Sequence, residues 1–125
     1  MPDTWTQVSR DSQSAAIEAL DRRRWRTSVS RSYFAVYAAV TAVAVDRRVE
    51  FASDREGPEH RQLVGIVLRN LGLGDNAGDV VGLATQLYQL RLRADYRPSS
   101  VIGAAEAQSV VSMMRKAANL LEVNR

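Results

Sequence analysis

The longest stretch without a charged residue covers Ser32–Val45, fourteen residues in all. Apolar side chains recur in it at three- and four-residue spacing with alanines on both flanks, which predicts a helix over about Ser28–Val45. A bilayer span needs about 20 apolar residues, so we expect a central helix buried in a bundle. No segment shows the sustained alternation of apolar and polar residues that is typical of a strand. The pattern therefore predicts an all-α fold.

Four further amphipathic helices are expected on the same grounds. The first begins near Ser9 or Asp11, the third covers about Pro58–Leu71, the fourth is capped by Asp79 and ends before Pro98, and the last begins at Ser99 or Ser100 and ends near Leu121. The last helix is expected to bury Val101, Ala105, Val111, Met114, Ala118 and Leu121. Together these helices predict one up-and-down bundle of four to five helices over residues 1–125, with its core at about 10–121.

Composition excludes several kinds of site. The chain has no cysteine and a single histidine, His60, so we expect neither a metal site nor a cofactor. The formal net charge is +3, and Lys116 is the only lysine among 17 positive residues. Arginine favours planar anionic partners such as phosphate, although codon bias explains the ratio equally well. The N-terminus lacks a basic start followed by an apolar run, so a cytoplasmic protein without a membrane segment is expected.

Two short basic segments each allow two interpretations. The cluster Arg22–Arg26 contains four arginines and Trp25. In one interpretation the arginines bind phosphate and Trp25 stacks on a base. In the other, Trp25 anchors a helix corner in the core and the arginines are solvated. Arg55 and His60 are separated by four residues, but Gly57 interrupts any shared helix. We therefore interpret that spacing as chance and His60 as a surface residue in a first helical turn.

The segment 90–98 gathers the most chemistry. Arg91 and Asp95 are four residues apart, so they are neighbours on one helix face, whereas Arg93 points away from both. Tyr96 and Arg97 follow directly where the helix ends. Without other information, an Arg91–Asp95 pair with Tyr96 packed on the bundle is the simplest interpretation.

Two motifs resemble a known family. The residues Ser30-Arg31-Ser32-Tyr33-Phe34-Ala35 are similar to the Ser-Arg-x-Tyr-Tyr-Ala pattern of prokaryotic HEPN-domain proteins. About fifty residues later, Leu90-Arg91-x-x-Ala94-Asp95-Tyr96 resembles the Leu-Arg-x-x-Ala-Asp-Tyr pattern of the same subgroup. The resemblance covers most of the chain, from about Arg10 to Leu121.

The resemblance implies a helical bundle that dimerises around its second and fourth helices. Many HEPN proteins are metal-independent ribonucleases of toxin–antitoxin or defence systems, often encoded beside a nucleotidyltransferase partner. Their signature is arginine followed by histidine after four to six residues, and here Tyr96 stands where that histidine would be. A phenol with a pKa near 10 is a weak general base at pH 7.

The first hypothesis is therefore a HEPN-type homodimer that binds nucleic acid or a nucleotide at an arginine-lined interface, with toxin-like ribonuclease activity as the reaction that the resemblance implies. Arg91 would hold phosphate, Asp95 would orient Arg91, and Tyr96 would supply a hydrogen bond or weak acid–base chemistry. The additional residues expected to bind nucleic acid are Arg31, Arg93 and Arg97.

Two other hypotheses remain open. In the second, the bundle is a non-catalytic interaction module that pairs with a nucleotidyltransferase or another protein. In the third, it is a helical DNA-binding protein, although the turn before the fourth helix lacks a compact helix-turn-helix signature.

Overall fold

The computed structural model describes residues 4–51 and 57–123, and in these ranges the chain forms five helices and no strand. The helices are α1 (Trp5–Asp21), α2 (Trp25–Asp46), α3 (His60–Arg69), α4 (Asn76–Tyr96) and α5 (Ala104–Val123). The predicted all-α bundle is confirmed.

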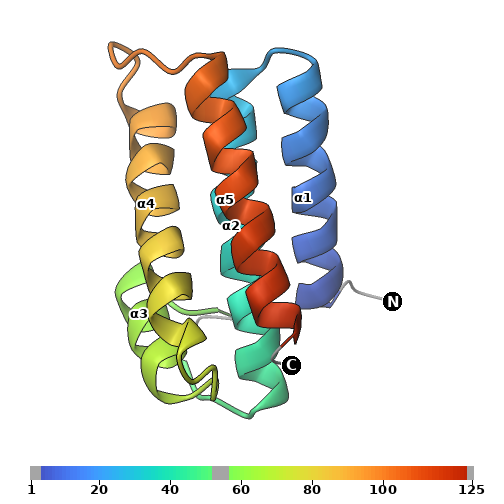
Figure 1. Cartoon of the computed structure of the whole chain (residues 1–125), viewed down its shortest axis with the longest axis vertical. Helices are drawn as coiled ribbons and strands as arrows, with labels where there is room; N and C mark the ends of the chain where they lie inside the picture. The colour runs from blue at the N-terminus through green and yellow to red at the C-terminus, as the bar shows by residue number, and fades with distance from the viewer. Residues whose placement is uncertain (1–3, 52–56, 124–125) are drawn as a thin grey trace.

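Four long helices run alternately up and down, and the short α3 lies beside the lower part of α4 (Figure 1). The helix α2 contacts all four of the others, as its charge-free sequence predicts for a central helix. Its N-terminal half lies beside the C-terminal end of α4, so residues far apart in sequence meet there (Figure 1).

The core consists mainly of small and medium aliphatic side chains. The largest fully buried residues are Leu63, Leu71, Leu87, Met114, Leu121, Val29, Val36, Val40, Val67, Val80, Val110 and Thr41. Tyr33 is the only aromatic residue that is buried in the described part of the chain. Burial of aliphatic area therefore stabilises the bundle, and Trp25, Tyr37, Phe51 and Tyr88 pack partly buried against this core.

The first helix begins at Trp5, so the predicted start at Ser9 or Asp11 is wrong. Thr4 accepts a hydrogen bond from the Gln7 backbone, and the Gln7 side chain accepts one from the Thr4 backbone at 2.8 Å. This capping box satisfies backbone donors of the first turn, so the helix begins four residues before Ser9, where the apolar stripe predicted its start. Ser9 lies inside the helix, buried, and donates to the Ala35 carbonyl oxygen at 2.7 Å.

The limits of the other helices also shift. The second starts at Trp25, before the predicted Ser28, which is buried and donates to the Ala16 carbonyl oxygen at 2.8 Å. The third starts at His60, with Glu59 as its N-cap. The fourth starts at Asn76, so Asp79 lies in the first turn and does not cap the helix. Ser9 and Ser28 lie inside helices because carbonyl oxygens of neighbouring helices accept their hydroxyl protons there.

The predicted start of the last helix at Ser99 or Ser100 is wrong, because α5 begins at Ala104. The Gly103 backbone donates to the Glu106 side chain at 3.0 Å, which stabilises this later start. Val101 precedes the helix and is 81% exposed, and Ala105 is exposed as well. The other four residues expected to face inward are buried.

The length and composition of α2 match those of a membrane span, but 67% of the relevant window is buried inside the bundle. The core helix of a soluble protein has the same properties. The helix therefore has a packing role that is sufficient to explain its apolar sequence.

Candidate functional site

A groove with a volume of about 740 Å³ lies where α2, α3 and α4 meet. Three kinds of side chain line it: cations (Arg31, Arg61, Arg91), rings (Tyr33, Phe34, Tyr37, His60, Tyr88) and oxygen groups (Ser30, Glu59, Asp95), with Pro58 at its edge. Charge and flat apolar surface thus share one opening.

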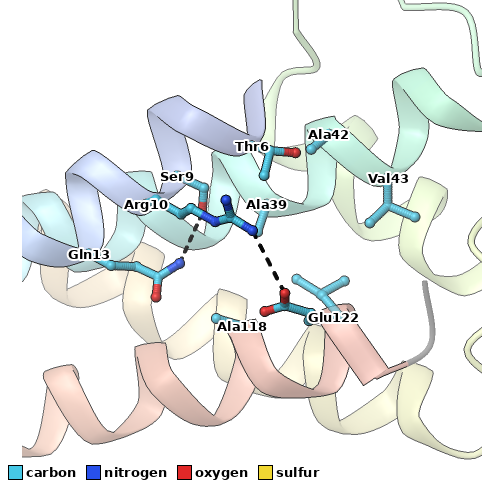
Figure 2. A pocket seen from close by; sticks show the side chains of 10 residues that line it. Thr6, Ser9, Arg10, Gln13, Ala39, Ala42, Val43, Ala118 and Glu122 are labelled. Carbon is cyan, nitrogen blue, oxygen red and sulfur yellow. Dashed lines mark hydrogen bonds and ion pairs between the residues drawn. The ribbon is translucent and has the colours of Figure 1, made fainter. Parts of the chain in front are cut away.

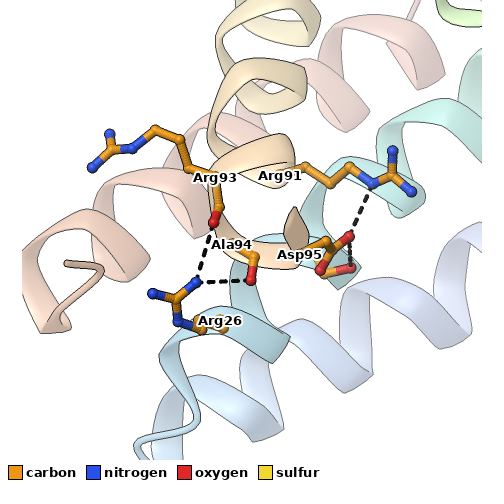
Figure 3. A network of polar contacts seen from close by, with 6 residues as sticks. Arg26, Arg91, Arg93, Ala94 and Asp95 are labelled. Carbon is orange, nitrogen blue, oxygen red and sulfur yellow. Dashed lines mark hydrogen bonds and ion pairs between the residues drawn. The ribbon is translucent and has the colours of Figure 1, made fainter. Parts of the chain in front are cut away.

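Arg91 is held in this groove by a carboxylate. Its Nε lies 3.0 Å from Oδ2 of Asp95, as the four-residue spacing predicts, and Ser30 Oγ donates to the same oxygen at 3.1 Å (Figure 3). The guanidinium also lies 5.9 Å from the ring centre of Tyr33 and 5.4 Å from that of Tyr96. The Arg91 side chain remains 31% exposed, so an anion can reach the guanidinium.

His60 lies in the first turn of α3, as predicted, but it also lines this groove, which the interpretation as a surface residue missed. Its ring stacks on Tyr88 with the centres 3.9 Å apart and the planes 5° from parallel. Its Nδ1 is 3.0 Å from the hydroxyl of Tyr33, the same residue whose ring faces Arg91. Tyr33 therefore contacts both the histidine and the arginine.

Burial shifts the pKa values of both partners in this hydrogen bond. Desolvation lowers the pKa of His60 below its usual 6.5, so the imidazole is neutral at pH 7. Burial is also the main cause that raises the pKa of Tyr33 well above 10, so its phenol stays protonated. A neutral imidazole oriented by a hydrogen bond is suited to transfer protons near neutral pH.

The groove contains more positive than negative side chains, with three arginines and two carboxylates. Asp95 is engaged with Arg91 and Ser30, and Glu59 is engaged in the capping box at the start of α3. Arg31 and Arg61 add two cations that form no ion pair within the described part of the chain. The groove is therefore suited to an anionic ligand.

Two of the predicted nucleic-acid-binding residues, Arg93 and Arg97, lie outside the groove that Arg31, Arg91 and Asp95 line. Arg93 donates to Ser100 Oγ at 2.9 Å and to the Val101 carbonyl oxygen at 3.4 Å, so it supports the connection between α4 and α5. Arg97 is exposed and does not line the groove. Tyr96 is 65% exposed and is not packed on the bundle, although it stays against Arg91.

In the basic cluster Arg22–Arg26, the anchor interpretation with solvated arginines fits Trp25 and the exposed Arg22, Arg23 and Arg24, but it does not fit Arg26. Arg26 donates to the carbonyl oxygens of Arg93 and Ala94 at 3.1 and 3.0 Å (Figure 3), and further to those of Arg97, Pro98 and Ser100. It thus caps the C-terminal end of α4. Trp25 is half-buried against the core, as expected of an anchor at a helix corner.

A second, smaller hollow of about 150 Å³ lies between α1, α2 and α5 (Figure 2). Arg10 and Glu122 face each other across it at 4.0 Å, and both side chains are mostly exposed. Ser9 and Gln13 in its wall are hydrogen-bonded to each other at 3.2 Å. Small alanines account for the hollow, and its polar groups satisfy one another.

In residues 4–51 and 57–123, no group of three or more His, Asp or Glu side chains is placed to hold a metal ion. No family model matches the chain, and the searches of curated proteins and of solved structures also give no match.

Proposed function

We propose that the chain is a HEPN-type, metal-independent ribonuclease, a toxin-like enzyme whose groove binds single RNA strands. The observation that carries this proposal is the meeting of Arg91 and His60 in one groove, with Tyr33 in contact with both. An arginine that binds phosphate and a neutral histidine that transfers a proton are two requirements for cleaving RNA without a metal.

Each residue then has a definite task. Arg91 binds the scissile phosphate, and Asp95 keeps the guanidinium oriented through Nε. In the tautomer whose proton is on Nδ1, His60 donates to the Tyr33 oxygen and presents a basic Nε2. That Nε2 takes the 2′-hydroxyl proton, the 2′-oxygen attacks phosphorus, and the bond to the 5′-oxygen breaks. The 5′-oxygen takes a proton from water, which leaves a 2′,3′-cyclic phosphate.

This assignment transfers the acid–base role from Tyr96 to His60. Tyr96 is mostly exposed and retains a supporting contact with Arg91. The histidine that the α4 motif lacks is supplied by α3.

The test is single-turnover cleavage of a labelled single-stranded RNA in excess chelator. We expect His60→Gln to slow cleavage by about 10²- to 10⁴-fold, in the range of a lost general base. Arg91→Ala is expected to lose both binding and cleavage, whereas Tyr96→Phe stays within about threefold of wild type. Arg115→Ala is the matched control, because Arg115 is exposed on α5, outside the groove.

Absence of cleavage by the wild-type protein, or equal rates in all variants, would remove the catalytic proposal. A substrate with a 2′-deoxy group at the cleaved position is expected to resist cleavage, because it lacks the attacking oxygen.

The proposal includes a homodimer. Tyr96 and Val101, which are 65% and 81% exposed, place apolar surface at the end of α4 and just after it. Light scattering coupled to size exclusion is expected to give twice the 13.8 kDa chain mass, and a monomer mass would contradict this part.

The Arg91–Asp95 ion pair favours a second candidate function, a non-catalytic module that binds a nucleotidyltransferase or another protein. An arginine that is already paired has less attraction for phosphate. Stoichiometric capture of such a partner by a protein that neither binds nor cleaves RNA would decide for this function.

A further inference from the structure

Aromatic residues are distributed unevenly in this molecule. Of its two tryptophans, two phenylalanines and four tyrosines, all except Trp25 and Phe51 line the groove or touch a residue that lines it. Aromatic side chains normally contribute large buried areas to a core. Tyr33 does so here, and Tyr37 and Tyr88 pack partly buried against the mainly aliphatic core. Core packing therefore accounts for some of the rings at this opening but not for all of them.

Phe34 shows this most clearly. It is half-buried and lines the groove, but it belongs neither to the core cluster nor to the described residues packed against that cluster. Its ring stacks on Tyr37 with the centres 5.7 Å apart and the planes 16° from parallel. The guanidinium carbon of Arg31 lies 5.1 Å from its ring centre.

The neighbours of Phe34 differ in how firmly they are held. Tyr37 is fixed by the edge-on ring of Trp5 at 5.9 Å and by the backbone at Gly57, where a β-carbon would collide with the tyrosine hydroxyl. Among residues 4–51 and 57–123, Arg31 is held by a cation–π contact over Phe34 and by no ion pair. A flat ligand that displaces Arg31 therefore meets a ring whose support stays in place.

We propose that Phe34 and Arg31 form a nucleobase subsite, in which an unpaired base of the RNA stacks on Phe34 and Arg31 turns to a neighbouring phosphate. This inference rests on the proposed function and names its substrate as single-stranded RNA. Stacking on an aromatic ring within a cationic groove is the usual way to bind a single strand with little sequence preference, and a duplex does not offer an unstacked base. Arg61 and Arg91 supply further cations in the groove for the backbone.

The test uses a short labelled oligoribonucleotide, a series of the same strand with one abasic nucleotide at each position, and the matching duplex. Phe34→Leu keeps an apolar side chain but removes the aromatic face, and Phe34→Trp keeps that face. We expect the leucine variant to bind the intact strand about tenfold more weakly, and the tryptophan variant to bind like wild type or better.

In the wild type, one abasic position is expected to weaken binding about tenfold, and Phe34→Leu is expected to abolish that positional effect. Equal binding of all the abasic strands, or binding of the duplex as tight as that of the single strand, would overturn the subsite while leaving the ribonuclease proposal intact. No RNA binding by the wild type would instead refute the proposed function itself. Thermal unfolding followed by circular dichroism verifies that each variant is folded.

Discussion

The helix α2 meets its neighbours with two different kinds of residue. Toward α1 and α5 it presents small aliphatic side chains such as Ala39, Ala42 and Val43. Toward α3 and α4 it presents Tyr33 and Phe34, together with charged groups. Close approach of backbones needs small residues, whereas an open groove with large rings serves recognition. On this comparison, substitutions on the first side change stability, and substitutions on the second side change ligand binding.

The largest expected effect on stability is in the core. Met114→Ala removes a fully buried side chain on α5 and should lower the free energy of unfolding by about 2–5 kcal/mol, measured by urea denaturation. Leu68→Ala, at a position that is 55% exposed, is the control and should stay within about 0.5 kcal/mol. Phe34→Leu is expected to cost less than the core variant, and an equal cost would break the comparison between the two sides.

The next largest effect on stability is expected at Arg26, which joins the start of α2 to the end of α4. Arg26→Ala removes the hydrogen bonds to carbonyl oxygens at the end of α4 and should cost about 2–3 kcal/mol. The same urea experiment measures this loss, with the exposed Arg24→Ala as a charge-matched control. If both variants lost equally little, Arg26 would not be what holds α4 against α2.

A smaller effect is expected at the corrected start of the first helix. Thr4→Ala removes the N-cap acceptor of α1 and should cost about 1 kcal/mol. Ser14→Ala, at an exposed position in the middle of the same helix, should be nearly neutral. Equal stabilities of the two variants would restore a helix start nearer Ser9.

The smallest effect is the pH dependence that comes from His60. Burial depresses its pKa in the folded protein, so the unfolded chain binds a proton first as the pH falls. The contribution to stability is complete above pH 6.5 and is lost as the pH falls through the folded pKa. His60→Gln should reduce the slope of the free energy of unfolding against pH between pH 7.5 and 5. An unchanged slope would mean that the imidazole is exposed to water in the folded protein.

The pH dependence of the cleavage rate is a second test of the lowered pKa of His60. In the proposed mechanism the neutral imidazole is the base, so cleavage should increase with pH through a pKa below 6.5 and then level off. A rate that keeps rising well above pH 7 would contradict a neutral imidazole as the base.

Sequence reasoning predicted the parts of the fold that follow from periodicity. The central position of α2, the burial of Leu63, Ile66 and Val67, and the Arg91–Asp95 contact are all confirmed. Each depends on residues three or four positions apart, so one helix face determines them.

Contacts between helices were beyond the same reasoning. His60 joins Tyr33 across 27 positions and stacks on Tyr88, which lies on a third helix, so no local spacing reveals the cluster. The concentration of tyrosines on α2 and α4 was the one available signal. Arg26 was misjudged for the same reason, because its acceptors lie about 70 residues away.

The most direct test of the proposed function is to determine which residues of the protein contact a bound RNA strand. We predict that ultraviolet crosslinking of a single-stranded RNA, followed by mass spectrometry, attaches nucleotides to peptides that contain Phe34 or Tyr88. Crosslinks confined to the cluster around Trp25, or none with a strand that binds tightly, would contradict a nucleic-acid site in the groove.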